Sequence, residues 1–257
     1  MSNVDIKELF EAGAHFGHTT SRWHPKMAPY IYGKRGNIHV IDLEKTVDCL
    51  DRATKFVEKI TSEGKQILYV GTKQQVKEII KGNAESVDMP YVNERWLGGM
   101  LTNFKTISSR VKQLKTLESK MESGELAGRY NKLEVQRFGE EIELLNLKFG
   151  GIKNMAGLPG AIFVADVVSD EIAVKEAARL GIPVIAIVDT NSNPTLVNYP
   201  IPSNDDASKA LNLIISSVTK AIENGKHKAK AKPSEKDDDA QPKSKAKPKK
   251  TLKSTKE

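Results

Sequence analysis

The sequence predicts an α/β protein in which an antiparallel helical hairpin is inserted into a doubly wound parallel sheet. Three observations support this fold class. Apolar runs at residues 67–70, 161–165 and 184–188 are continuous rather than alternating, as in strands that are buried on both faces. Helical patterns separate these runs, and strands that alternate with helices form parallel sheets. A long segment between two of the strands carries two helical stripes instead of one.

Capping residues predict where two of the helices begin. Thr72 and Gln75 are three positions apart, which matches a capping box directly after the first apolar run. Ser203 and Asp206 have the same spacing, so we expect the last helix to begin there and to end near residue 224. Apolar spacing alone predicts the remaining elements: a helix at about 43–62, a short strand at 91–92 and a helix at about 171–180.

The inserted segment has two apolar stripes with spacings of three and four residues. The first stripe consists of Ile107, Val111, Leu114, Leu117 and Met121. The second consists of Val135, Phe138, Ile142, Leu145 and Phe149. A turn with two glycines at 124–128 separates them, so we expect a helical hairpin at about 104–149 that projects from the sheet.

The first helix of this hairpin has an excess of positive charge that favours an anionic partner. Up to Met121, its only acidic residue is Glu118, and its basic residues are Lys105, Arg110, Lys112, Lys115 and Lys120. The alternative is a plain structural arm.

The net charge of +7 is confined to the C-terminal segment, because residues 226–257 hold 12 lysines and 5 acidic residues. This segment is almost free of apolar residues, so we expect a disordered tail after an α/β body at 1–225. The single cysteine, Cys49, excludes an internal disulfide framework and a cysteine-based zinc cluster. No apolar run is long enough to span a membrane, and the first residues lack a signal-peptide core. We therefore expect a cytoplasmic protein without a membrane partner.

Residues 16–38 contain no acidic residue and form a candidate RNA-binding segment. Two prolines suggest a loop-like path. Basic side chains neutralise phosphates, and aromatic rings stack on unpaired bases. The basic residues are Arg22, Lys26, Lys34 and Arg35, and the aromatic ones are Phe16, Trp23, Tyr30 and Tyr32. The alternative is that the aromatic residues are core anchors and the charges a solvated rim.

The stretch at 93–103 follows the strand at 91–92, at the edge where doubly wound sheets usually bind ligands. It contains Arg95, Trp96 and the adjacent glycines Gly98 and Gly99, which suggest a close approach of a partner. The alternative is a tight connection into the hairpin, with Trp96 packed beneath it.

Catalysis is disfavoured because the chain lacks the motifs that would support it. It has no phosphate-binding GxxxxGK[ST] loop, no GxGxxG after a strand and no GxSxG nucleophile elbow. We therefore do not expect an enzyme. A protein–protein scaffold without RNA contact remains an alternative, since the body is neutral.

A metal site is a further expectation at the carboxyl edge of the sheet. His18, Asp189 and Asp205 can converge there, and imidazole and carboxylate groups bind zinc and other divalent ions. The alternative is that the carboxylates cap turns and a helix N-terminus while the histidine forms hydrogen bonds in the core.

Segments spread in order along the chain resemble the bacterial small-subunit ribosomal protein two family, also called the universal ribosomal protein two family. They lie at 12–18, 22–31, 95–103, 159–176, 188–191 and 201–207. The sequence departs from the family pattern at Ser203, where a glycine is usual. The lysine-rich tail is not a fixed feature of the family.

The resemblance implies a flavodoxin-like sheet and a structural role on the back of the small ribosomal subunit, between head and body. It implies contact with small-subunit ribosomal RNA and with other small-subunit proteins, including attachment of the messenger-binding ribosomal protein one. We expect that no cofactor is required. A structural zinc ion at the expected metal site would tie the N-terminal segment to the sheet and shape the surface offered to protein one. The residues we expect at the RNA are Arg22, Trp23, Lys26, Lys34, Arg35, Arg95, Lys105 and Arg110.

Overall fold

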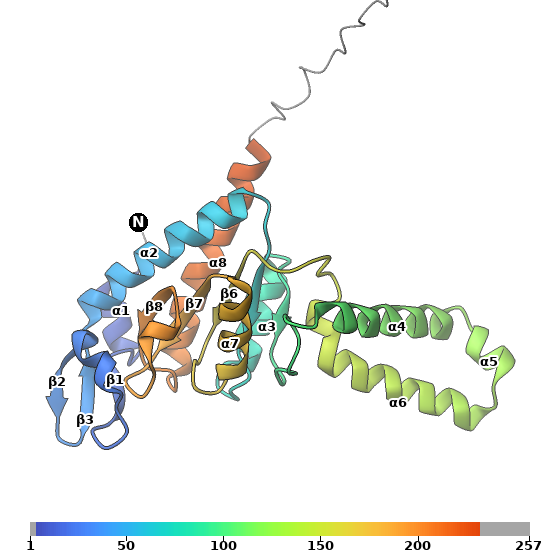
Figure 1. Cartoon of the computed structure of the whole chain (residues 1–257), viewed down its shortest axis with the longest axis horizontal. Helices are drawn as coiled ribbons and strands as arrows, with labels where there is room; N and C mark the ends of the chain where they lie inside the picture. The colour runs from blue at the N-terminus through green and yellow to red at the C-terminus, as the bar shows by residue number, and fades with distance from the viewer. Residues whose placement is uncertain (1–3, 232–257) are drawn as a thin grey trace, which may run out of the picture.

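The computed structural model describes residues 4–231 and confirms the predicted fold class (Figure 1). Five parallel strands form the central sheet in the order β5-β4-β6-β7-β8. They are β4 (Ile67–Val70), β5 (Tyr91–Val92), β6 (Ala161–Val164), β7 (Val184–Val188) and β8 (Tyr199–Pro202). If these five strands are counted along the chain, their order is 2-1-3-4-5, which is the flavodoxin-like order.

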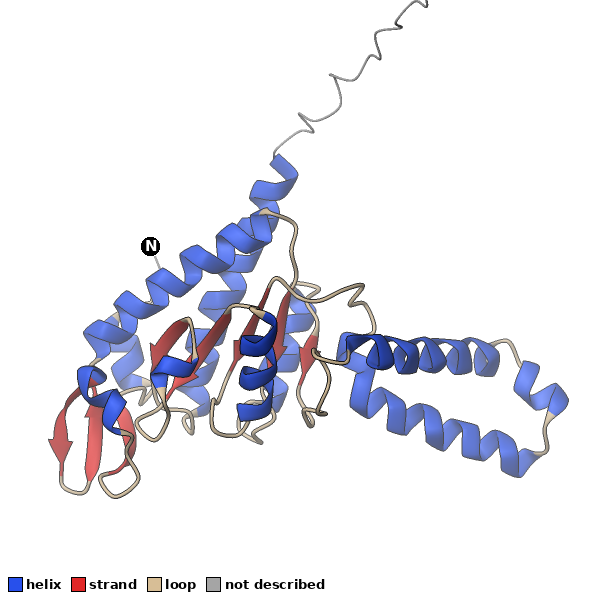
Figure 2. Ribbon diagram, viewed as in Figure 1, coloured by secondary structure: helices blue, strands red, loops and turns tan. Residues whose placement is uncertain are grey.

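Both faces of the sheet are covered, which explains why its strands are apolar throughout (Figure 2). One face packs against α2 (Leu43–Ser62), α3 (Lys77–Ser86) and α8 (Ser208–Ala231). The other face packs against α7 (Glu171–Leu180) and the base of the hairpin. Along β6, Phe163 contributes to the first layer, and Ile162 and Val164 contribute to the second.

The predicted hairpin is confirmed and projects from the sheet on one side (Figure 1). It consists of α4 (Phe104–Glu122), a short α5 (Glu125–Arg129) at the tip and α6 (Lys132–Phe149). Ile107, Val111 and Leu114 are buried on α4, and Leu145 and Phe149 are buried on α6. These residues belong to the predicted stripes.

The N-terminal segment forms a second, antiparallel sheet that the sequence did not predict. Its strands, in the order β1-β3-β2, are β1 (Phe16–Thr19), β2 (Ile31–Arg35) and β3 (Ile38–Ile41). The expected loop at 16–38 is therefore wrong for most of its length. Its two prolines lie in a 3-10 helix, η1 (Pro25–Tyr30), between β1 and β2, and Gly36 turns the chain into β3 with φ of 62°. α1 (Ile6–Glu11) precedes this sheet.

Both predicted helix starts are wrong, because the capping residues have other partners. α3 begins at Lys77 without a side-chain cap, and Thr72 instead donates a hydrogen bond to a distant carboxylate. α8 begins at Ser208, while Ser203 is buried and its backbone N–H bonds to Val188.

The last helix continues past residue 224 to Ala231, so it includes the first six residues of the expected tail. The rest of that tail, residues 232–257, lies outside the described residues.

Candidate nucleic-acid interface

The N-terminal sheet presents the acid-free segment to solvent. Arg22, Lys26, Lys34 and Arg35 are all exposed. Tyr32 is 81% exposed, and Trp23 is 37% exposed with its ring 5.1 Å from that of His39. Tyr32 is therefore not a core anchor. Met27 of η1 has that role, since its side chain is fully buried.

Long-range hydrogen bonds attach this sheet rigidly to the end of β7. The backbone N–H of His24 donates to Thr190 O at 2.7 Å, and that of His18 donates to Thr190 Oγ1 at 2.8 Å. Gly17 lies so close that an added Cβ would be 2.5 Å from Thr190 Cγ2, so this approach requires glycine. The basic and aromatic side chains consequently have a fixed position relative to the main sheet.

A hollow of about 570 Å³ opens where the two sheets meet. Among the residues that line it, Arg22 carries a positive charge, and His18 and Asp206 are the other ionisable residues. The remaining lining is small or neutral: Gly17, Thr19, Ser21, Ile38 and Asn204.

The loop at 93–103 is wrapped around the buried carboxylate of Glu176. That carboxylate accepts hydrogen bonds from the backbone N–H groups of Gly99 at 2.7 Å and of Leu101 and Thr102 at 3.0 Å. The indole N–H of Trp96 and the Thr102 hydroxyl also donate to it, at 3.2 and 3.1 Å. Burial opposes ionisation, but these donors outweigh it and lower the pKa of Glu176.

Gly99 therefore donates to a carboxylate of the chain itself, and the adjacent Gly98 is exposed. Trp96 is buried, which agrees with the alternative that this loop is a tight connection into the hairpin. Arg95 next to it is exposed. The sequence did not identify Glu176, because its position on α7 is 74 residues or more from every donor.

The basic side of the hairpin is exposed along α4. Lys105 and Arg110 are both solvent-exposed, and the Arg110 guanidinium donates to Gln113 at 3.0 Å. The carboxylate of Glu118 is engaged by Lys153 at 2.6 Å and by Asn146 at 2.7 Å.

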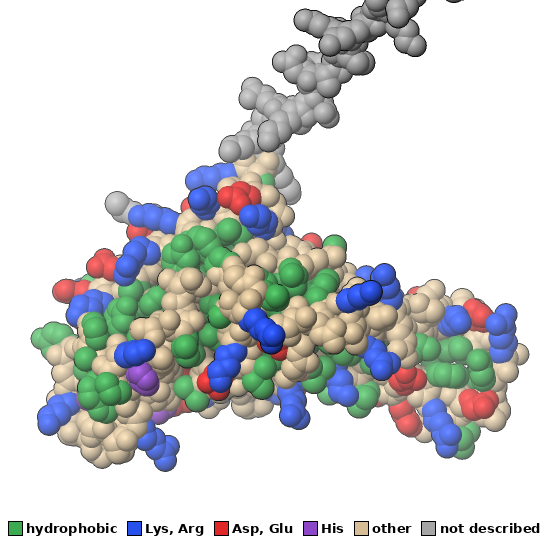
Figure 3. Space-filling model, viewed as in Figure 1, with side chains coloured by type: hydrophobic (Ala, Val, Ile, Leu, Met, Phe, Trp, Pro, Cys, Tyr) green, Lys and Arg blue, Asp and Glu red, His purple; other side chains and the backbone are tan. Residues whose placement is uncertain are grey.

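The structure does not gather the expected RNA contacts into one patch. The N-terminal sheet and the hairpin lie at opposite ends of the central sheet (Figure 1). Lysine and arginine side chains are spread over the whole face seen in Figure 3, from one end to the other. Arg95 lies in the loop before the hairpin and so belongs with Lys105 and Arg110.

The expected metal ligands do converge. His18, Asp189 and Asp205 each offer an atom, and these atoms lie within 4.8 Å of one another. His18 Nδ1 is 3.2 Å from Asp189 Oδ2, which also accepts the backbone N–H of Asp205 at 3.2 Å. The pKa of His18 is raised, chiefly by its hydrogen bond to Asp189.

Lys73, which the sequence analysis did not include, places an ammonium group in this carboxylate cluster. Its Nζ is 2.8 Å from Asp205 Oδ1, 2.6 Å from Asp206 Oδ1 and 3.9 Å from Asp166 Oδ2. Burial lowers the pKa of Lys73, but these carboxylates outweigh it and raise the pKa overall. The sequence did contain a signal for Lys73, because this residue follows the end of β4. β4 adjoins β6 at the switch point of the sheet, where ligands and polar groups usually gather.

The crevice at this switch point is thus filled by the chain's own side chains. Thr72 donates its backbone N–H and its hydroxyl to Asp170, at 3.2 and 2.9 Å. Asp166 accepts from Ser169 and from the backbone of Val168. Related folds bind ligands in this crevice, whereas in this protein a network of internal hydrogen bonds occupies it.

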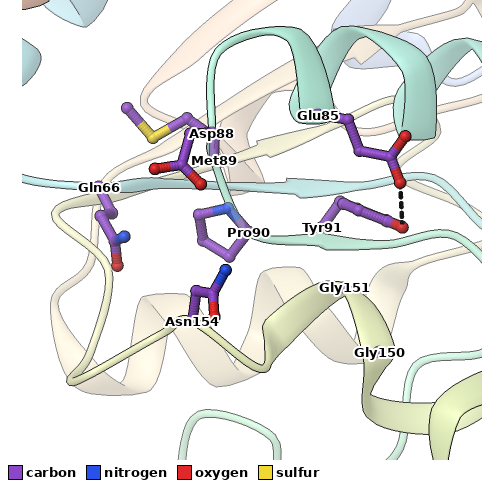
Figure 4. A pocket seen from close by; sticks show the side chains of 9 residues that line it. All are labelled: Gln66, Glu85, Asp88, Met89, Pro90, Tyr91, Gly150, Gly151 and Asn154. Atoms are coloured by element: carbon purple, nitrogen blue, oxygen red, sulfur yellow. Dashed lines mark hydrogen bonds between the residues drawn. The ribbon is translucent and has the colours of Figure 1, made fainter.

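A second hollow, of about 220 Å³, lies beside the edge strand β5 (Figure 4). Glu85 and Asp88 supply acidic groups, with Gln66 and Asn154 as neutral neighbours. The Tyr91 hydroxyl donates to Glu85 at 2.8 Å. This lining contains no cation, so it does not suit phosphate groups.

No helix within residues 4–231 combines the length and the apolar character needed to cross a membrane.

Comparison with known proteins gives matches over the sheet and the hairpin together. The family described as ribosomal protein S2 matches residues 9–225. A small ribosomal subunit protein uS2 from Syntrophobacter fumaroxidans is 51% identical over 228 residues, which cover 89% of this chain and 83% of the relative. The protein of that name from Dehalococcoides mccartyi strain CBDB1 is 50% identical over 222 residues, covering 86% and 90%. That from Coprothermobacter proteolyticus is 48% identical over 226 residues, covering 88% and 84%.

These matches confirm the resemblance drawn from the sequence segments. They also confirm the expectation of a structural protein of translation rather than an enzyme. The chain belongs to the ribosomal protein S2 family.

Proposed function

We propose that this chain is a structural constituent of the small ribosomal subunit in the cytoplasm and binds ribosomal RNA through two separate surfaces. The observation that carries the proposal is the exposure of all eight expected RNA-contacting side chains. Arg22, Trp23, Lys26, Lys34 and Arg35 form the first surface, and Arg95, Lys105 and Arg110 form the second.

The first surface combines charge with an exposed ring. Four exposed cations follow one another without an intervening acidic residue in the sequence. Tyr32 and Trp23 offer faces on which unpaired bases stack. The hydrogen bonds to Thr190 hold these groups in place before RNA binds, which lowers the entropy lost on binding.

The second surface supports contact with phosphates at a distance from the first. Arg95, Lys105 and Arg110 are exposed at and beyond the base of a projecting arm. Two surfaces on one body raise the effective concentration of the second contact once the first has formed.

The test is binding to small-subunit ribosomal RNA and sedimentation with small subunits over a range of salt concentrations. Arg22→Glu with Arg35→Glu should reduce the salt slope of binding by about 2, because each phosphate contact contributes about 1. The matched control is Lys59→Glu with Lys220→Glu, which changes two exposed lysines of α2 and α8 and the same net charge. If the Arg22→Glu, Arg35→Glu variant assembles like the original protein at every salt concentration, the proposal is wrong.

A protein scaffold without RNA contact is the alternative, and ultraviolet crosslinking distinguishes the two. Crosslinks from the N-terminal sheet to RNA support the proposal, and crosslinks to proteins alone support the scaffold. We also propose contacts with other small-subunit proteins and a role in attaching the messenger-binding ribosomal protein one, as the family resemblance implies. Subunits that lack this chain should then lose protein one.

We propose further that His18, Asp189 and Asp205 bind a structural zinc ion when zinc is supplied, although the fold requires no cofactor. Their nitrogen and oxygen atoms lie close enough to share one ion. An ion at Asp205 must displace the Lys73 ammonium, so Lys73→Met should bind zinc more tightly than the original protein. Elemental analysis and melting temperature with added zinc measure this. Metal below about a tenth of an equivalent in both proteins would exclude the site.

A further inference from the structure

The hollow at the junction of the two sheets is lined by a cation without a partner. Arg22 lines this hollow, and within residues 4–231 its guanidinium forms no hydrogen bond and no ion pair. The backbone N–H of Arg22 donates to Thr19 O at 2.9 Å, which fixes the turn that carries it. The volume of about 570 Å³ lies within the range of about 300–1,000 Å³ that is usual for small-molecule sites. The hollow therefore combines the size of a ligand site with a free donor group.

A carboxylate oxygen is the second free polar group of the hollow. The side chain of Asp206 is 55% exposed, and its Oδ1 is 2.6 Å from Lys73 Nζ. Its Oδ2 is 3.9 Å from His18 Nε2, which is too long for a hydrogen bond. Asn204, in contrast, is already engaged, because its amide donates to Gly13 O at 3.1 Å and accepts the backbone N–H of Asp206 at 2.8 Å. A ligand in the hollow thus meets one cation and one acceptor.

An apolar side chain and a second cation lie on the same face of the N-terminal sheet. Ile38 lines the hollow and is 40% exposed. In the sheet it is paired with Thr19 of β1 and with Arg35 of β2. Directly paired residues present their side chains on one face, so the exposed Arg35 lies beside Ile38. Guanidinium groups bind phosphates and stack on bases, and these surroundings therefore suit a planar ring that is linked to a phosphate.

Buried carboxylates decide which part of a nucleotide enters the hollow. Asp189 and Asp205 each offer an oxygen within 4.8 Å of a ring nitrogen of His18, which lines the hollow. A phosphate at this inner end would be repelled by them, whereas a neutral base would not. The base therefore occupies the hollow, and its phosphate stays outside with Arg22 and Arg35.

We infer that this hollow binds one unpaired guanine of ribosomal RNA, whose N1–H and N2–H groups donate to Asp206. The inference deepens the proposed function and rests on it. A carboxylate only accepts hydrogen bonds, and its two oxygens keep free lone pairs beside Lys73. Guanine is the base with two adjacent donors on its Watson–Crick edge. Adenine and cytosine place an acceptor nitrogen beside their amino group, and uracil places its one N–H between two carbonyl groups, so each of them meets a carboxylate less well.

A basic side chain of another protein fits the hollow less well than a guanine does. It would pair with Asp206, but it would also lie close to Arg22, whose charge has no partner within the described residues. A nucleotide satisfies both groups, because its base offers donors and its phosphate offers negative charge.

Chemical probing of guanines tests the inference in small subunits that lack this chain. A dicarbonyl reagent that modifies N1 and N2 of unpaired guanines should react about tenfold less with one guanine after the protein is added. Asp206→Asn should restore most of this reactivity, because an amide offers one acceptor oxygen where the guanine needs two. Asp48→Asn is the matched control, since it removes an exposed carboxylate of α2, and it should keep the protection.

The outcomes of this probing separate the inference from the proposed function. Entry of the protein into the subunits without protection of any guanine would overturn the inference and leave the proposed function intact. A protected guanine that Asp206→Asn does not expose would overturn it as well. If the original protein does not enter the subunits at all, the proposed function also fails.

Substitution in the RNA provides a second test that leaves the protein unchanged. Adenine in place of the protected guanine should lower the affinity of the original protein for reconstituted subunits about tenfold. The Asp206→Asn protein has already lost this contact and should lose less than about twofold. A photoreactive residue in place of the exposed Ser21, which lines the hollow, should crosslink to the same guanine. Equal losses for both proteins, or a crosslink to another protein instead, would contradict the inference.

Discussion

Buried carboxylates organise the loops at the carboxyl edge of the sheet. Glu176 is surrounded by hydrogen-bond donors, so its pKa is lowered and it stays ionised. Asp170 and Asp205 have fewer compensating partners, and burial raises the pKa of each to about 6. The pKa of a buried carboxyl group is thus lowered or raised according to the hydrogen-bond donors and charges around it.

Removal of the Glu176 carboxylate should disorder the loop before the hairpin. Glu176→Ala leaves the backbone N–H groups of Gly99, Leu101 and Thr102 without their acceptor, and we expect a loss of about 3 kcal/mol. Glu171→Ala on the same helix removes an exposed ion pair with Lys175 and an acidic group from the first helical turn, and should cost no more than about 1 kcal/mol. Urea unfolding measures both, and equal losses would contradict this role.

Asp170 should make stability depend on pH. Its pKa in the folded protein, about 6, lies above the ordinary value of 3.8, mainly because of burial. The folded state therefore binds the proton more tightly, and this contribution is present below about pH 4 and lost as the pH rises through 6. Asp170→Asn cannot ionise, so its stability relative to the original protein should rise by about 2–3 kcal/mol between pH 4 and 7.

Urea unfolding at several pH values checks this expectation. Asp205 adds a slope of the same sign to both proteins, so the difference between them isolates Asp170. A difference that is constant with pH would show that Asp170 has an ordinary pKa.

At the scale of elements, the edge strand β5 is protected by the segment that returns from the hairpin. β5 has only two residues, and η2 (Gly150–Ile152) lies against it. Gly151 contacts the carbonyl oxygen and the ring of Tyr91 where any Cβ would clash. The hairpin is thus attached to the body at both of its ends, before it by hydrogen bonds to Glu176 of α7 and after it by the contact of Gly151 with Tyr91.

Gly151→Ala should destabilise the protein by about 2 kcal/mol, because the backbone of Tyr91 must move. Gly139→Ala is the matched control. Gly139 lies within α6 with open space around it, so alanine should stabilise the helix by about 1 kcal/mol. Thermal unfolding should therefore show shifts of opposite sign, and a lower melting temperature for both variants would contradict this account.

At the scale of the whole molecule, α8 connects the body to the lysine-rich segment. Lys226 donates to the carbonyl oxygen of Val87, and Lys228 pairs with Glu58 of α2. The folded part therefore extends past residue 225, the expected boundary of the body, at least to these contacts.

Two truncations should separate these contributions. Deletion of 232–257 should leave the unfolding free energy unchanged and reduce non-specific RNA affinity, because this segment has nine lysines and five acidic residues. Deletion of 226–257 should cost about 1 kcal/mol more, through loss of the Lys226 and Lys228 contacts. Equal stability of both truncated proteins would show that these contacts contribute nothing.

The sequence by itself determined the features that arise from local pattern. Continuous apolar runs predicted strands buried on both faces, and two stripes with a glycine turn predicted the hairpin, because side-chain periodicity directly reflects which face is covered. The proximity of Asp189 and Asp205 was also predictable, since the ends of parallel strands meet at one edge, whereas His18 reaches them from the antiparallel N-terminal sheet.

Only the tertiary structure decided which partners those local signals find. Thr72 bonds to Asp170 rather than capping α3, and Lys73 enters the carboxylate cluster, because residues far apart in the chain compete for the same polar groups. The N-terminal sheet was missed because its strands alternate weakly and its anchor, Thr190, lies about 170 residues away. The separation of the two basic surfaces also depends on how the layers pack, and side-chain periodicity carries no information about that.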